Sequence, residues 1–86
     1  MWQIEYSKEV RDYIYDSYPY THSVWQLVKS LRQRPDGIPT ERWTALEPGV
    51  ILWEVADHLV IYERNVAARN LLVFVLKPSG DEDFDE

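Results

Sequence analysis

Hydrophobic and polar residues alternate at the start of the chain. Trp2, Ile4 and Tyr6 are separated by polar residues, which is the period-two pattern of a half-buried strand. Ser7 follows as a suitable N-cap, and apolar residues then recur at helical spacing over about residues 8–18. The pattern therefore predicts a short strand that leads directly into a helix.

A second helix is predicted after Pro19, because a proline disfavours helical backbone in the residue before it. Thr21 is a candidate N-cap for this helix. Apolar side chains at positions 24, 27, 28 and 31 then follow the i, i+3, i+4, i+7 spacing of one helix face. The two predicted helices should form a hairpin.

The segment after this hairpin is rich in turn residues. Residues 34–37 have the composition of a turn, and residues 38–48 contain prolines near both ends. We expect residues 38–48 to form an ordered loop or a short helical turn around Arg42 and Trp43.

Three strands are predicted in the second half of the chain. Alternation over residues 50–55, a tight turn at residues 56–57 and renewed alternation over residues 58–63 indicate a hairpin. Residues 64–70 should form the next loop. The continuous apolar run 71–76 is typical of a strand that is central in its sheet or covered on both faces.

The predicted order is strand, helix, helix, strand, strand, strand. We therefore predict an α+β fold in which a three-stranded antiparallel meander joins the N-terminal strand in one mixed sheet. The helical hairpin packs on one face of this sheet, which buries the apolar residues of both the helices and the strands. Residues 1–78 are predicted to form this small single domain. The acid-rich residues 79–86 are predicted to form a mobile tail.

Composition narrows the function classes. The chain has no cysteine, and its two histidines lie on separate predicted elements, so neither a metal site nor a cofactor is predicted. The net charge is −6, but residues 81–86 carry five of the fifteen acids, which leaves ten acids against nine bases. A nearly neutral body makes nucleic acid or the ribosome a less favoured partner. No apolar run is long enough to span a membrane, so we expect a cytoplasmic protein.

Basic residues after the second predicted helix form a candidate binding patch. Arg32, Arg34 and Arg42 could contact phosphate or the protein's own acidic tail, and so could Lys77 just after the last predicted strand. The alternative is that these cations simply favour a helix C-terminus and solvated loops.

Aliphatic residues of the first predicted hairpin form a candidate protein-binding face. If the helices cover the face that carries Trp53 and Tyr62, then Val50, Leu52, Leu59 and Ile61 lie on the other side of the sheet. Burial of these side chains would favour a protein partner, a homodimer or the docked tail. The alternative is that residues 38–48 cover them.

Residues 42–63, RWTALEPGVILWEVADHLVIYE, resemble the corresponding stretch of the RelE/ParE toxin superfamily. Members of that superfamily have a glycine before an aromatic-basic-leucine-basic strand, then a Gly-Asp turn, then a strand with tyrosine and arginine. Together with the order of elements, the resemblance covers roughly residues 2–76 and implies a RelE/ParE-like fold.

In RNA-cleaving members, the resemblance would imply ribosome-dependent mRNA cleavage by basic side chains on the exposed sheet face. Leu52, Glu54 and Leu59 stand at those basic positions here, and Lys77 is the only cation near the position of the basic segment after the last strand. Each such donor is typically worth on the order of 3–4 kcal/mol of transition-state stabilisation. Enzymatic activity is therefore left open, and a role without catalysis is favoured.

The resemblance favours a toxin-related protein of a toxin–antitoxin type system that acts through protein contacts at Leu52, Glu54, Leu59 and Ile61. Its partner would be an antitoxin-like or other protein segment that adds a strand or helix. One alternative is a non-catalytic interaction or regulatory module on the same fold. A weaker alternative is a ribosome-dependent mRNA endoribonuclease with a rearranged site.

Overall fold

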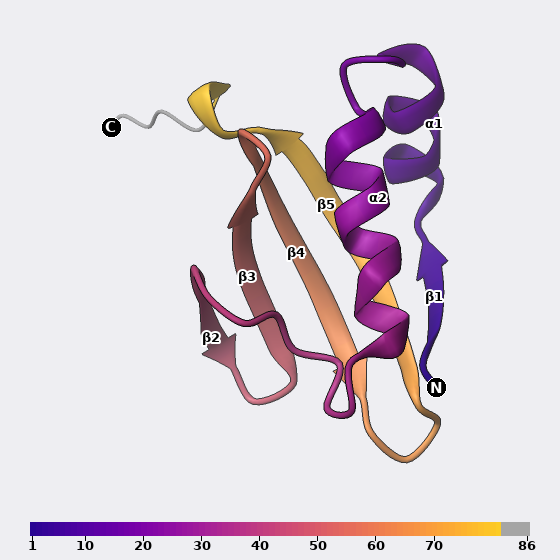
Figure 1. Ribbon diagram of the computed structural model, residues 1–86, viewed down its shortest axis with the longest axis vertical. Coiled ribbons are helices and arrows are strands. Elements are labelled where there is room, and N and C mark those ends of the chain that lie inside the picture. Colours follow the sequence, from indigo (N-terminus) through magenta and orange to yellow (C-terminus); the bar gives the residue numbers. More distant parts are fainter. Residues whose placement is uncertain (82–86) are drawn as a thin grey trace.

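A five-stranded mixed sheet carries two helices on one face, as Figure 1 shows for the computed structural model, which describes residues 1–81. The strand order in the sheet is β1-β5-β4-β3-β2, with β1 parallel to β5 and the other neighbours antiparallel. The elements are β1 (Gln3–Tyr6), α1 (Lys8–Asp16), α2 (His22–Ser30), the 3-10 turn η1 (Leu31–Gln33), β2 (Trp43–Glu47), β3 (Val50–Val55), β4 (His58–Asn65), β5 (Asn70–Pro78) and the 3-10 turn η2 (Ser79–Asp81).

This arrangement confirms the predicted α+β class and the order of strand, helical hairpin and antiparallel meander. The tail predicted for residues 79–86 begins with η2, and residues 82–86 lie outside the described residues.

Two hydroxyl side chains were predicted to cap the helices, and they do different things. The Ser7 hydroxyl accepts a hydrogen bond from the Val10 amide at 3.3 Å, so it caps α1 as expected. Thr21 stands at the start of α2 but makes no side-chain cap bond. Its fully buried hydroxyl instead donates to the Ile14 carbonyl at 2.8 Å, which joins the end of α1 to the start of α2.

The prediction of a loop or short helical turn over residues 38–48 is wrong for its second half. Residues 43–47 form the edge strand β2, which pairs with β3 from Trp43 opposite Trp53 to Glu47 opposite Val50, with a bulge between Ala45 and Glu47. All five residues of β2 are exposed, so the segment lacks the alternation of a half-buried strand.

The core lies between the helices and the inner face of the sheet. β5 is an interior strand between β1 and β4, and its pairing with β4 passes from Ile61 opposite Val75 to Tyr62 opposite Val73. Phe74 is therefore an extra residue at a bulge and is 40% exposed. The buried apolar side chains are Trp2, Val10, Ile14, Val24, Val28, Leu31, Ile51, Trp53, Val60, Tyr62, Leu71, Val73 and Leu76.

The loop after η1 is fastened onto the inner face of the sheet. Gly37 adopts φ +69°, and a Cβ built there would lie 3.0 Å from Cε2 of Trp2. The Tyr62 hydroxyl donates to the Gly37 carbonyl at 2.8 Å, and the Trp2 indole donates to the Pro35 carbonyl at 3.2 Å. The absence of a side chain at position 37 therefore lets the loop backbone approach the core.

The substitution Gly37→Ala should lower the free energy of unfolding by roughly 1–3 kcal/mol, because it adds a methyl group to a filled space and forces an L residue into positive φ. Urea unfolding measures the effect. Gly80→Ala is the matched control, since a Cβ there meets nothing within 4 Å. Equal stability of the two variants would contradict this account of the loop.

Stability should fall at alkaline pH partly because of Tyr62. Burial raises the pKa of its phenol above the ordinary value, more than the nearby Arg64 charge lowers it. The folded state then holds the proton more tightly than the unfolded state, so this contribution is fully present below about pH 10 and is lost as the pH rises further.

Tyr62→Phe cannot ionise, so its urea midpoint should fall less than that of the wild type between about pH 8 and about pH 11. Tyr15→Phe serves as the control, because Tyr15 is 75% exposed. A wild-type pH slope in the Tyr62 variant would refute the role of this phenol.

Candidate functional site

The four residues predicted to bind protein share one face of the sheet. Leu52 lies opposite Ile61, and Glu54 lies opposite Leu59, in the antiparallel pairing of β3 with β4. Directly paired residues point to the same side, and their neighbours Trp53, Val60 and Tyr62 are buried on the other side. Leu52, Leu59 and Ile61 are half-buried and Glu54 is exposed.

The same face continues onto the other strands. Ile61 pairs with Val75, Leu59 with Lys77, and Leu72 with both Glu63 and Glu5. We call this surface the helix-free face. Its aliphatic centre consists of Val50, Leu52, Leu59, Ile61, Leu72 and Val75, and its charged rim consists of Glu5, Glu54, Glu63 and Lys77.

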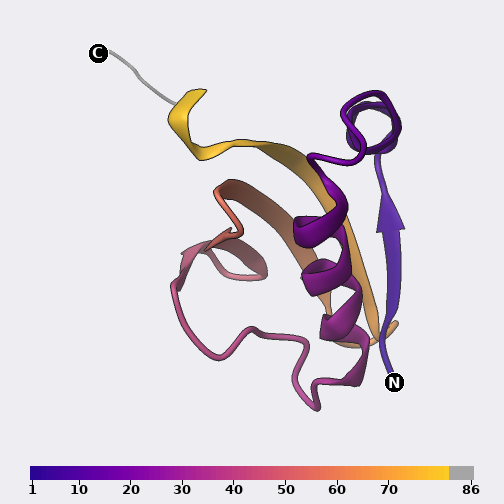
Figure 2. The same ribbon diagram turned by 45° about the horizontal axis from the view of Figure 1, so that its top comes forward.

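The expectation that residues 38–48 might cover this face is wrong. The loop before β2 lies on the helix side, where Thr40 and Glu41 border a hollow with Leu27 of α2 and Trp53 of β3. Figures 1 and 2 show the helices and this loop on the same side of the sheet. None of the helices or loops described in residues 1–81 crosses the aliphatic centre.

Arg42 and Glu54 form an ion pair at the β2 edge of this face. Their side-chain atoms Nη2 and Oε1 are 3.8 Å apart, and the Glu54 amide donates to the Arg42 carbonyl at 3.0 Å. Both side chains are more than half exposed, at 67% and 51%, so the pair contributes little to stability. Its effect is to offset the negative charge of Glu54 at this edge.

The structure does not bring the predicted basic residues together. Arg34 donates from Nε to the Ile38 carbonyl at 3.0 Å and so closes its own loop. Arg32 is exposed beside β1, whereas Arg42 lies beside β3 at the other side of the sheet. Lys77 stands opposite Leu59 on the helix-free face. Contact of these residues with phosphate or with the tail stays a prediction.

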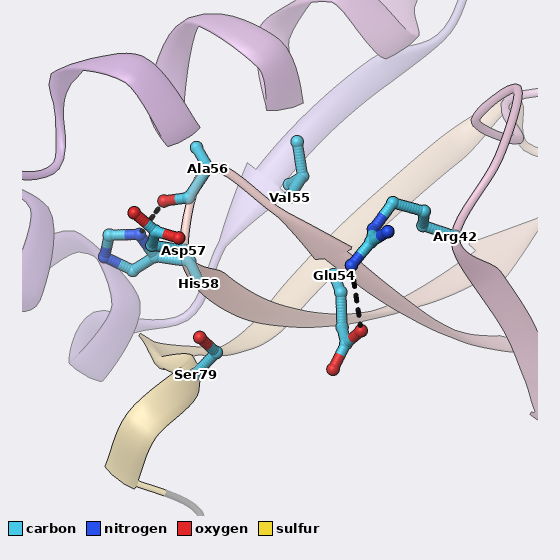
Figure 3. A pocket seen from close by; sticks show the side chains of 7 residues that line it. All are labelled: Arg42, Glu54, Val55, Ala56, Asp57, His58 and Ser79. Atoms are coloured by element: carbon cyan, nitrogen blue, oxygen red, sulfur yellow. Dashed lines mark hydrogen bonds and ion pairs between the residues drawn. The ribbon is translucent and has the colours of Figure 1, made fainter.

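A polar hollow of about 290 Å³ lies beside the β3–β4 turn (Figure 3). It is lined by Arg42, Glu54, Val55, Ala56, Asp57, His58 and Ser79. Ala56 and Asp57 have φ values of +52° and +61°, which is the backbone of a tight two-residue hairpin turn. The turn brings η2 close, and the Ser79 amide donates to the Asp57 carbonyl at 2.9 Å.

His58, which borders this hollow, makes hydrogen bonds within the protein. It is 1% exposed, its Nδ1 lies 2.9 Å from the Ala56 carbonyl and its Nε2 lies 2.7 Å from the Tyr13 hydroxyl. Because a carbonyl only accepts, Nδ1 carries the hydrogen of the bond to Ala56. Both ring nitrogens are engaged within the protein. Sequence patterns gave no signal for this contact, because its residues are 45 positions apart.

Among residues 1–81, no three His, Asp or Glu side chains lie close enough to hold a metal ion. In the same residues, no helix is long and apolar enough to cross a membrane.

Within residues 1–81, a helical pair thus lies on one face of a mixed sheet, and no helix lies on its aliphatic face. Among solved structures, a metal-bound toxin from Helicobacter pylori has a similar fold, with a TM-score of 0.63 and 15% sequence identity over 96% of this chain and 100% of that one. At this identity, the likeness shows a shared fold. Comparison with family models and with curated protein sequences finds no match.

His58→Phe should lower the free energy of unfolding by roughly 1–3 kcal/mol, because it removes the buried hydrogen bonds from the ring to the Ala56 carbonyl and to the Tyr13 hydroxyl. Thermal and urea unfolding measure the loss. His22→Phe is the control at an exposed histidine of α2. A His58 variant as stable as the control would show that these contacts do not support the fold.

Proposed function

We propose that this protein is a toxin-related protein of a toxin–antitoxin type system and that it acts through protein contacts at the helix-free face. The observation that carries the proposal is the row of Leu52, Ile61 and Val75 across β3, β4 and β5 on a face without helices. Apolar surface of this kind gains about 25 cal/mol per Å² when a partner removes it from water. The fold shared with a toxin supports the toxin-related part of the proposal.

The charges around this face favour a protein over RNA. RNA binding and cleavage need clustered cations that neutralise phosphate and stabilise developing charge. Among the described strand residues of this face, Lys77 is the single cation, and Glu5, Glu54 and Glu63 are acids. An aliphatic centre with a charged rim is the usual anatomy of a protein interface.

Substitution at the centre of the face should abolish the biological effect while leaving the fold intact. We expect expression of the wild type alone to arrest growth, and Leu52→Arg or Leu59→Glu to relieve the arrest, because each places a charge where the partner buries an aliphatic side chain. Both residues are half-exposed, so the thermal midpoint should change little. Growth curves and thermal unfolding are measured on the same variants.

Val66→Glu is the matched control. Val66 is 55% exposed in the β4–β5 turn, away from the aliphatic centre, so its variant should still arrest growth. Harmless expression of the wild type would argue against a toxin. If a co-purified protein were then lost from both face variants and kept by the control, the interaction module would be favoured instead.

A further inference from the structure

The outer edge of β1 is open. β1 pairs with β5 alone, and the Gln3 and Ser7 amides donate to carbonyls of Arg69 and Val73 at 2.9 and 3.0 Å. In a parallel pairing, alternate residues point their backbone groups to one side, so those of Ile4 and Tyr6 point away from β5. No backbone hydrogen bond from the described residues reaches them on that side. Such an edge can accept another strand.

The chain already makes the first contact along this edge. The Trp2 amide, which points to the same side as those of Ile4 and Tyr6, donates to the Arg32 carbonyl at 3.2 Å. The segment after α2 therefore occupies the start of the edge and leaves the next two outward positions free. Figures 1 and 2 show β1 at the margin of the sheet, with α2 over the neighbouring strands.

A groove runs beside the open positions. A hollow of about 370 Å³ lies between β1 and the side chains Trp25, Lys29 and Arg32. A smaller hollow of about 80 Å³ shares Tyr6 and Trp25 and continues to α1. We call the two hollows together the β1 groove; its lining residues outside β1 are Arg11, Ile14, Tyr15, Trp25, Lys29 and Arg32.

Charge in the β1 groove is divided between its two sides. Lys29 and Arg32 border it from the helix side, and the Lys29 ammonium lies 4.1 Å above the Trp25 ring. Gln3 and Glu5 face the opposite side of the sheet, where Glu5 pairs with Leu72 of the helix-free face. A strand added at this edge would therefore point alternate side chains toward two cations and toward one acid.

We propose that the β1 groove binds an extended acidic segment of a partner protein, which adds a strand to β1. Its backbone bonds the free groups of Ile4 and Tyr6. Its carboxylates face Lys29 and Arg32, and its alternate, uncharged side chains face Glu5. The β1 groove shares Glu5 with the rim of the helix-free face but none of its aliphatic centre, so the proposal is tested independently of the function proposed above.

The last described element, η2, lies away from the β1 groove. η2 is held at the β3–β4 turn through the bond from Ser79 to Asp57, whereas β1 forms the opposite edge of the sheet from β2 and β3. In Figure 1, β5 and α2 lie between η2 and β1.

A synthetic peptide tests the proposal directly. The probe is an acetylated, amidated hexapeptide of alternating glutamate and threonine, and the control peptide has lysine in place of glutamate. On the full chain, the glutamate peptide should slow amide hydrogen exchange of Ile4 and Tyr6 by at least about tenfold at saturation. The lysine peptide should bind at least about tenfold more weakly.

Charge reversal on the protein gives the matching arm. Lys29→Glu combined with Arg32→Glu should weaken binding of the glutamate peptide at least about tenfold and should improve binding of the lysine peptide. Lys8→Glu is the control, since that side chain is 80% exposed on α1 and pairs with Asp12 outside the groove. Leu59→Glu should bind the peptide like the wild type.

Three results would overturn the proposal. The first is equal binding of the two peptides. The second is slowed exchange at Leu52 and Leu59 with no change at Ile4 and Tyr6. The third is self-association of the wild type that is lost on removal of residues 82–86 and on charge reversal, because the occupant would then be a second copy of this chain.

Discussion

The contact of Trp2 with the backbone of Gly37 is the constraint on which the arrangement of the molecule depends. The indole of Trp2 is 1% exposed, and the loop carbonyls of Pro35 and Gly37 accept hydrogen bonds from Trp2 and Tyr62. These bonds hold the segment that follows the helical hairpin on the helix side of the sheet. Within residues 1–81, the helices and the loop before β2 therefore lie on one face of the sheet. Because side chains alternate along a strand, the other half of the strand side chains points away from the helices.

The outward set of side chains is the basis of the proposed protein contact. Leu52 and Leu59 belong to the two strands whose inward residues fill the core, so their direction is fixed by burial of Trp53 and Val60. The two leucines therefore face outward together on rigid, paired strands. At the β2 edge, the Arg42 guanidinium lies beside the Glu54 carboxylate, which offsets part of its positive charge.

The pattern of apolar and polar residues was sufficient to predict the elements that have one buried side. It did not predict features that depend on contacts between distant segments. Trp2, Val24 and Tyr62 each belong to a set of apolar residues at strand or helix spacing, and the elements that contain these sets were predicted correctly. β2 was missed because an edge strand exposed on both sides shows no alternation. Packing of separate segments determines the hydrogen bond from Thr21 to Ile14 and the separation of Arg32 from Arg42. The spacing of residues in the sequence does not predict such packing.

The helix-free face and the β1 groove meet at one register pair, Glu5 and Leu72. A strand bound at β1 would therefore lie next to the aliphatic centre, and a short continuation of the same partner chain could reach it. Linking two weak contacts in this way raises the effective concentration of the second segment, commonly to the millimolar range for short flexible linkers. The two surfaces would also bind different side chains of the partner: acidic ones at the β1 groove and aliphatic ones at the helix-free face. Only a partner with both, in that order and spacing, would gain from the linkage, so the division of charge across β1 would add specificity to the proposed contact.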